Sequence, residues 1–212
     1  MTVGRTAMAT EINGKIQTLK IEGLDINYVD AGSGHPIIVF PRKDDDSADL
    51  IVEKIADSHR IIFLQLPIED YPPVGKIGRK LAHALTRLGI EHCCIIAFSS
   101  GAPAAIALAV SAPEQIDRLI LLSPSLYDAE LPDLAEVKAS TLVLIGTQHT
   151  GAVIEAGRLC RERISSCHLS FIYGERDALT QERTEAWLKP IVQFLEQGEQ
   201  FIIFRESQVI RP

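Results

Sequence analysis

Residues 92–110 determine the fold. They comprise the run His92-Cys-Cys-Ile-Ile-Ala-Phe98, the small residues Ser99-Ser100-Gly101, and the segment Ala102-Pro-Ala-Ala-Ile-Ala-Leu-Ala-Val110. A short uncharged run rich in isoleucine is typical of a strand that is buried on both faces. Alanine is the strongest helix former, so the last segment favours a helix. The stretch therefore predicts a buried strand that turns at Ser99 directly into a helix.

The turn itself carries a motif. Ala97-Phe98-Ser99-Ser100-Gly101 follows the pattern G-x-S-x-G, with alanine in place of the first glycine. In this pattern a tight strand-to-helix turn raises a serine oxygen to the carboxyl edge of the sheet, and the turn requires small neighbours. A serine at the start of a helix is also the usual N-cap residue. The motif thus predicts either an exposed nucleophile or an ordinary helix cap.

On both sides of this stretch, apolar runs alternate with helical patterns. A parallel sheet covered by helices on both faces produces this alternation. Two short runs at 17–21 and 24–29 flank Glu22-Gly23 and predict an antiparallel hairpin. The other predicted strands are 36–40, 60–66, 92–98, 117–122, 141–145 and 167–173, with a further short edge strand at 201–204. The predicted helices are 47–58, 76–88, 102–110, 152–164 and 181–196.

Composition indicates one globular domain. The chain has 212 residues, 46% of them hydrophobic, with a formal net charge of −7. This length suits a single domain over residues 1–212, with an irregular segment at 1–14 and a tail at 198–212. An acidic chain is a poor general binder of nucleic acids or of anionic membranes, so neither is expected as a partner.

The compartment signals favour the cytoplasm. The first residues contain no apolar segment of the secretory type, and the longest apolar stretch, 102–110, is too short to span a bilayer. The four cysteines form no C-x-x-C motif, so we expect them to be small buried hydrophobic residues in a reducing environment. They are Cys93, Cys94, Cys160 and Cys167.

Nucleotide and metal sites are not expected. The sequence has no G-x-x-x-x-G-K-[ST] loop, and Gly32-Ser33-Gly34 precedes a strand and not a helix. No group of histidines and carboxylates has the spacing of metal ligands, so no cofactor is predicted. Five histidines lie at strand starts or within a helix, where we expect structural roles: His35, His59, His83, His92 and His168.

Four segments together resemble the α/β-hydrolase family. They are LDINYVDAGSGHPIIVF at 24–40, GIEHCCIIAFSSGAPAAIALAVSAPEQIDRLILLSPS at 89–125, STLVLIGTQH at 140–149 and CHLSFIYGERDALTQERTEAWLKPIVQFL at 167–195. The resemblance extends over residues 17–197 and implies a three-layer α/β sandwich with a mostly parallel twisted sheet. The connection SLYDAELPDLAEVKA at 125–139 leaves no room for the cap domain of larger relatives.

The resemblance also implies site residues. Ser99 corresponds to the nucleophile, and the backbone N–H of Ser100 corresponds to the first oxyanion donor. The second donor would be the N–H of Lys43, although this chain has Pro41-Arg42 where the family usually has His-Gly. The acidic run 44–46 follows; a solvated helix start explains it, and facing the site it would repel anionic substrates.

The remaining triad positions are altered. His149 occupies the place of the family's acid, and Asp177 occupies the place of its histidine. Some relatives place the acid near Asp128 or Glu130, which would supply no base. Either His149 is the base and Asp177 its orienting group, or the triad has been lost, because geometry and not chain order defines a triad.

Two functions therefore follow from the sequence. The first is a serine hydrolase that acts on an uncharged ester or related acyl compound through acyl-Ser99. The second is a catalytically impaired relative that serves as a ligand-binding or protein-interaction module. The expected partner is a small-molecule acyl substrate or ligand, and the sequence does not determine the oligomeric state.

Overall fold

The computed structural model describes residues 15–41, 54–66, 74–126, 131–175 and 184–201. Its centre is an eight-stranded sheet with the strand order β1-β2-β4-β3-β5-β6-β7-β8. The strands are β1 Gln17–Ile21, β2 Leu24–Ala31, β3 Pro36–Phe40, β4 Arg60–Gln65, β5 Cys93–Phe98, β6 Ile116–Leu122, β7 Ser140–Gly146 and β8 Cys167–Ile172. The pairs β1–β2 and β2–β4 are antiparallel, and every other pair is parallel.

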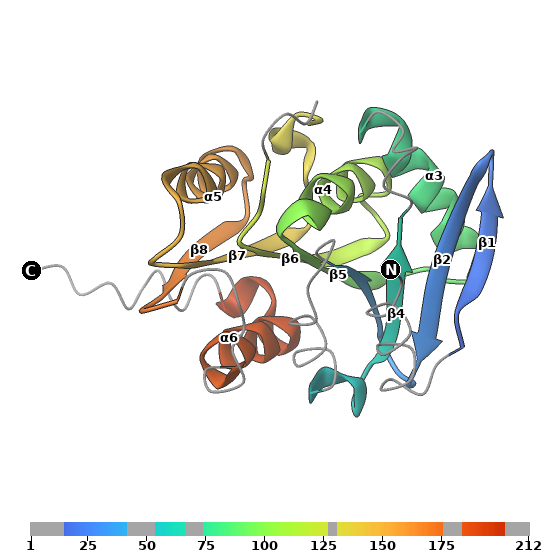
Figure 1. Ribbon diagram of the computed structural model, residues 1–212, viewed down its shortest axis with the longest axis horizontal. Helices are drawn as coiled ribbons and strands as arrows, with labels where there is room; N and C mark the ends of the chain where they lie inside the picture. The colour runs from blue at the N-terminus through green and yellow to red at the C-terminus, as the bar shows by residue number, and fades with distance from the viewer. Residues whose placement is uncertain (1–14, 42–53, 67–73, 127–130, 176–183, 202–212) are drawn as a thin grey trace, which may run out of the picture.

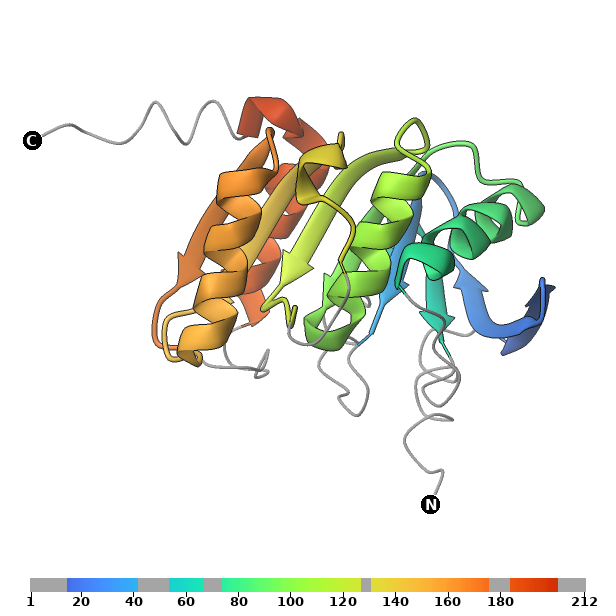
Figure 2. The same ribbon diagram turned by 90° about the horizontal axis from the view of Figure 1, so that it is seen from above.

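Helices cover both faces of this sheet (Figure 1). Three of them lie on one face: α3 Val74–Arg87, α4 Ala102–Ser111 and α5 Gly151–Arg163. They lie side by side when the molecule is seen from above (Figure 2). Helix α6, Thr184–Gln197, lies on the opposite face. The predicted three-layer α/β-hydrolase-like sandwich is confirmed, and the described residues include no cap domain.

The central strands explain why the sequence forms these layers. All six residues of β5 are buried, and their side chains alternate between two cores. Cys93, Ile95 and Ala97 pack on the side of α3 and α4. Cys94, Ile96 and Phe98 pack with Trp187 of α6 on the other side. Because successive side chains of a strand point to opposite faces, a continuous apolar run is what a strand between two helical layers requires.

Close contact between α3 and α4 depends on one glycine. A Cβ atom added to Gly78 would lie 2.2 Å from the carbonyl oxygen of Ala107 and 2.4 Å from Oγ of Ser111. Such distances are impossible for real atoms, so only glycine allows this helix spacing. Helix α4 is consequently buried almost all round, and the small side chains of its sequence are what permit the burial.

The edge of the sheet begins with the predicted hairpin. Glu22 and Gly23 both have positive φ angles, 44° and 79°, as a two-residue type I′ turn requires. The turn contacts α3: Lys80 Nζ donates to the Glu22 carbonyl at 2.8 Å, and His83 Nδ1 lies 2.8 Å from the Glu22 carboxylate. These contacts attach the antiparallel hairpin to the parallel part of the fold.

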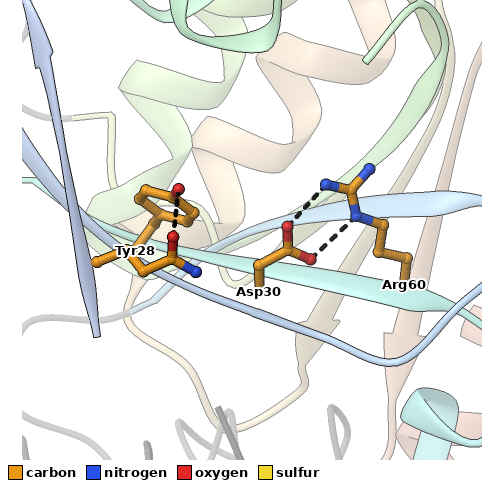
Figure 3. A network of polar contacts seen from close by, with 4 residues as sticks. Tyr28, Asp30 and Arg60 are labelled. Atoms are coloured by element: carbon orange, nitrogen blue, oxygen red, sulfur yellow. Dashed lines mark hydrogen bonds and ion pairs between the residues drawn. The ribbon is translucent and has the colours of Figure 1, made fainter. Parts of the chain in front are cut away.

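A bidentate ion pair joins β2 and β4 (Figure 3). Arg60 Nε lies 2.9 Å from Asp30 Oδ1, and Arg60 Nη2 lies 2.7 Å from Asp30 Oδ2. On the same strand, Tyr28 Oη donates to Gln17 Oε1 at 3.0 Å and thereby links β1 to β2. The hydrogen bonds that Arg60 donates to Asp30 raise the pKa of Arg60, which is the expected effect of a carboxylate on a guanidinium.

Most predicted elements are confirmed within one or two residues at their ends. The helix predicted at 47–58 is described only from residue 54, where residues 54–56 are helical. The edge strand predicted at 201–204 is wrong at Phe201, which is helical and 3% exposed. Phe201 instead packs its ring edge-on against Phe194 and His168, at centroid distances of 5.7 Å and 5.6 Å. Residues 202–204 lie outside the described residues.

Candidate active site

Ser99 lies at the carboxyl end of β5 in a left-handed conformation. Its φ angle is 42°, which is uncommon for a residue with a side chain. The strand ends at Phe98, a short 3₁₀ turn covers Ser99–Gly101, and α4 begins at Ala102. This is the sharp strand–turn–helix connection that the G-x-S-x-G pattern predicts, and it leaves Ser99 partly exposed.

The turn is tight because it lies against β3. A Cβ atom on Gly101 would lie 2.8 Å from both the Cβ and the carbonyl oxygen of Phe40. The glycine of the motif is therefore required at this position. Ala97, which replaces the first glycine, is fully buried in strand β5. The structure accommodates its methyl group without breaking the strand.

The alternative interpretation of Ser99 as an ordinary N-cap is wrong. The N-cap of the 3₁₀ turn is Phe98, and the N-cap of α4 is Gly101; neither position has a side-chain cap hydrogen bond. Among the residues that the structure describes, no hydrogen bond involves Ser99 Oγ. The hydroxyl group is therefore not used to stabilise the helix start.

Ser100 lies at the start of the helical segment and is exposed. Amide groups in a first helical turn have no acceptor in a preceding turn, so they are available to an anion. The Ser100 N–H belongs to the same peptide group as the Ser99 carbonyl. That carbonyl accepts a hydrogen bond from the N–H of Ala102. The role of the Ser100 N–H as the first oxyanion donor stays a prediction.

A second serine in the same conformation lies beside Ser99. Phe98 and Leu122 are register partners on the parallel strands β5 and β6, so Ser99 and Ser123 follow them at equivalent positions. Ser123 has a φ angle of 45° and is 5% exposed. Its Oγ is buried and has no hydrogen-bond partner among the described residues. The sequence analysis did not single out Ser123, because a serine after a strand carries no sign of its backbone angle.

The turn after β6 is bound to both neighbouring strands. The N–H of Ser123 donates to the carbonyl of Leu144 on β7 at 2.8 Å. The N–H of Ser125 donates to the carbonyl of Ser99 at 3.1 Å. The segment Ser123-Pro124-Ser125 therefore connects the serine elbow to β7 across the carboxyl edge of the sheet.

His149 lies in the turn that follows β7, at the same edge of the sheet. Its backbone N–H donates to the Gly146 carbonyl at 3.1 Å, and its Nδ1 accepts a hydrogen bond from the Thr150 N–H at 2.9 Å. A neutral imidazole whose Nδ1 accepts carries its proton on Nε2, where it is a donor. In this geometry His149 has its acceptor nitrogen occupied by Thr150.

The other two predicted site residues, Lys43 and Asp177, lie outside the described residues. The same holds for the acidic run 44–46 and for Asp128 and Glu130. The second oxyanion donor and the orienting carboxylate therefore stay predictions. What the structure brings together are the ends of β5, β6 and β7, which carry Ser99, Ser123 and the turn of His149.

The remaining histidines make local contacts away from this edge. His35 and His92 lie 3.1 Å and 3.3 Å from the carboxylate of Asp117, near the starts of β3, β5 and β6. His59 Nδ1 lies 3.2 Å from the Ile55 carbonyl. His83 and His168 contact Glu22 and Phe201, as described above. These contacts agree with the structural roles expected from the sequence.

The cysteines are free and buried, as predicted. Burial raises the pKa of all four thiols: that of Cys94 to about 11, those of Cys160 and Cys167 to about 12, and that of Cys93 further still. A hydrogen bond from Arg118 partly opposes the shift at Cys94. Because the thiolate is the reactive form, these cysteines are poor nucleophiles at neutral pH.

Two other kinds of feature are absent from the described residues. Within the described residues, no group of three or more His, Cys, Asp and Glu side chains could hold a metal ion. None of the helices described in the structure has the length and apolar character needed to cross a membrane.

Comparison with known proteins gives a fold. No protein-family model matches the chain, and no curated protein matches it. Solved structures do match. A naproxen esterase from Bacillus subtilis aligns with a TM-score of 0.75 at 11% identity, over 90% of this chain and 95% of the esterase.

Two further structures agree. An α/β hydrolase from a lagoon-sediment metagenome of Mar Chica, Morocco, aligns with a TM-score of 0.72 at 16% identity, over 86% of this chain and 98% of its own. A membrane phospholipase A, a bacterial virulence factor, aligns with a TM-score of 0.76 at 14% identity, over 91% and 89% of the two chains. Identities this low establish the architecture and not the chemistry. By its strand order, its helical layers and these similarities, the chain is an α/β-hydrolase-fold protein.

Proposed function

We propose that the protein is a serine hydrolase that cleaves an uncharged ester or related acyl compound through an acyl-Ser99 intermediate. The observation that carries this proposal is the conformation of Ser99: a residue with a φ angle of 42°, at a strand end, with no side-chain capping role. Non-glycine residues in this region cost free energy, and such strain concentrates at functional sites.

The chemistry follows from the elbow. Ser99 Oγ attacks the acyl carbonyl carbon and loses its proton to a base, and the Ser100 N–H stabilises the oxyanion that forms. Collapse of the tetrahedral intermediate breaks the bond to the alcohol oxygen, which takes the proton back from the base, and leaves the acyl group on Ser99. Water then attacks the acyl-enzyme, releases the acid and restores the serine. A substrate without negative charge suits a chain whose formal net charge is −7.

We propose His149 as the base, with Asp177 as its orienting group. The Thr150 hydrogen bond to His149 Nδ1 sets a condition on this role. To accept the Ser99 proton at Nε2, the ring must first carry its proton on Nδ1, which requires loss of the Thr150 contact. Hydrogen bonds of catalytic groups often form only when substrate is bound, so we expect the hydrogen bond between His149 and Ser99 to form in the substrate complex.

A labelling experiment tests the proposal. A fluorophosphonate probe should label the wild type, should fail to label Ser99→Ala, and should label the control Ser165→Ala, since Ser165 is an exposed serine between α5 and β8. If the wild type is not labelled over hours at several pH values, the serine-hydrolase proposal is refuted and the non-catalytic alternative is favoured.

A second experiment tests the base. His149→Ala should lower the rate of short-chain p-nitrophenyl ester hydrolysis by at least ~10²-fold, the lower scale of general-base catalysis. An unchanged rate would remove His149 from the mechanism while leaving Ser99 as the nucleophile.

We also propose that the protein acts in the cytoplasm without a cofactor. The four free buried cysteines are consistent with a reducing compartment. Hydrolysis through acyl-Ser99 needs no group beyond the chain and water.

A further inference from the structure

We infer that the turn Ser123-Pro124-Ser125 is a positioning element for the oxyanion donor of the proposed hydrolase. This inference rests on the proposed function, because it concerns the same peptide group between Ser99 and Ser100. The turn acts through one hydrogen bond, from the Ser125 N–H to the Ser99 carbonyl oxygen at 3.1 Å.

The peptide group between Ser99 and Ser100 is rigid. The six atoms from one Cα to the next are nearly coplanar, with the carbonyl and the N–H pointing in opposite directions. Whatever fixes the Ser99 carbonyl therefore also fixes the direction of the Ser100 N–H. Two donors fix that carbonyl: the Ala102 N–H from the helix and the Ser125 N–H from the neighbouring strand end.

The two hydrogen bonds also polarise the Ser99 carbonyl. A carbonyl that accepts two hydrogen bonds is more strongly polarised, and the N–H of the same peptide group becomes a better donor. Hydrogen bonds in series strengthen one another by roughly 10–30% per bond in condensed phases. The Ser125 contact thus both aims the Ser100 N–H and makes it a stronger partner for a developing oxyanion.

The turn Ser123-Pro124-Ser125 is itself held rigidly. The Ser123 N–H donates to the Leu144 carbonyl of β7 at 2.8 Å, which anchors one end of the turn to the sheet. Pro124 has a restricted φ angle. The other end of the turn is then held where the Ser125 N–H meets the elbow. The turn therefore holds the peptide group after Ser99 in a fixed position relative to β7.

Two features of Ser123 in this turn lower the stability of the fold. Ser123 has a left-handed backbone, and its buried Oγ has no partner among the described residues. Each feature is unfavourable for a serine, and an unsatisfied buried hydroxyl calls for an explanation. The positioning contact itself comes from the Ser125 N–H, so it depends on the turn and not on the Ser123 side chain.

The test separates position from stability. Ser125→Pro removes the backbone donor, and Pro124→Gly loosens the turn while keeping that donor. For each variant, kcat and KM for a short-chain p-nitrophenyl ester are measured, together with the inhibition constant of a trifluoromethyl ketone that mimics the tetrahedral intermediate. The control is Arg60→Ala, which loses the ion pair to Asp30 on strands β2 and β4, away from the elbow.

We expect Ser125→Pro to lower kcat about 10-fold, below the roughly 10²–10³-fold effect of removing a whole oxyanion donor. KM should stay within twofold, and ketone binding should weaken by about the same factor as kcat. Pro124→Gly should have a smaller effect in the same direction. Arg60→Ala should lose stability and keep the wild-type kcat, which shows that a general loss of stability does not produce this result.

The inference is overturned if Ser125→Pro keeps kcat and ketone affinity within twofold of the wild type. Where Ser125→Pro does not fold, an unchanged kcat in Pro124→Gly overturns it instead. It is also overturned if Arg60→Ala loses as much kcat as the turn variants. A wild type that neither hydrolyses esters nor reacts with fluorophosphonate refutes the proposed function itself, and that result is distinct from an active enzyme with indifferent turn variants.

Discussion

Replacement of Ser99 by glycine should stabilise the protein while abolishing its reactivity. The φ angle of 42° places Ser99 in the left-handed region, where an L-residue loses roughly 1–2 kcal/mol relative to the right-handed region. Glycine does not have this penalty, but its unfolded chain is more flexible, which costs about 0.5–1 kcal/mol. The net gain for Ser99→Gly is therefore about 0–1.5 kcal/mol, centred near ~0.75 kcal/mol.

Ser99→Ala is the matched control, because alanine also lacks the hydroxyl but keeps the Cβ that makes the conformation unfavourable. For a chain of this size, 1 kcal/mol corresponds to roughly 2–4 °C in Tm. We therefore expect Ser99→Gly to melt about 1–4 °C above Ser99→Ala, with a parallel shift of the urea midpoint at unchanged m-value. Both variants should be inert to fluorophosphonate.

The comparison has a clear refuting result. If Ser99→Gly is no more stable than Ser99→Ala, position 99 is not strained, and the main support for a nucleophile at this position is lost. The pair of variants also tests the backbone independently of any substrate, because unfolding is measured in the absence of chemistry.

Three further changes should have measurable effects. Gly78→Ala should destabilise the fold by ~2–3 kcal/mol, as overpacked cores do, because the added Cβ would meet the Ala107 carbonyl. The control Gly151→Ala, whose added Cβ has nothing within 4 Å, should be neutral or slightly stabilising in urea unfolding. Asp30→Asn should cost about 1.5–3 kcal/mol, the range for hydrogen bonds to charged groups. A double-mutant cycle with Arg60→Ala should show coupling, since the pair is bidentate and only 22–29% exposed. Burial raises the thiol pKa values from 9.0 to about 11 or 12, so the stability that the thiols contribute is fully present below pH 9 and is lost as the pH rises through the raised values. Cys160→Ala should therefore flatten the fall in Tm above pH 9. An unchanged slope of Tm against pH would contradict the raised pKa of Cys160.

The fold could be predicted from the sequence because its signals are local. A strand such as Pro36–Phe40 is a short apolar run with a clear start and end, and its predicted limits match the structure. The turn at Glu22-Gly23 is likewise set by adjacent residues. Phe201 is the exception, because the choice between strand and helix there depends on the rings of Phe194 and His168, which only the folded chain brings near.

The candidate site could be predicted only in part. The motif around Ser99 is contiguous, so position 99 could be identified directly. The contact between Ser125 and Ser99 joins the ends of two strands and depends on the register of β5 and β6. The tautomer of the His149 imidazole depends on the direction of the Thr150 N–H, which cannot be predicted from a residue pattern. Backbone angles and hydrogen-bond directions are properties of the fold and not of residue identity.

The two strained serines bear on the choice between an enzyme and a non-catalytic relative. Ser99 and Ser123 occupy equivalent positions on adjacent strands, and both have left-handed backbones. Glycine at either position would remove the penalty, and at position 123 it would also remove a buried hydroxyl without a partner among the described residues. A binding module that needs only the surface of the sheet has no physical reason to keep these serines. A hydrolase has a reason at Ser99, which supplies the nucleophilic oxygen; the Ser125 contact concerns the turn after β6 and requires no particular side chain at position 123.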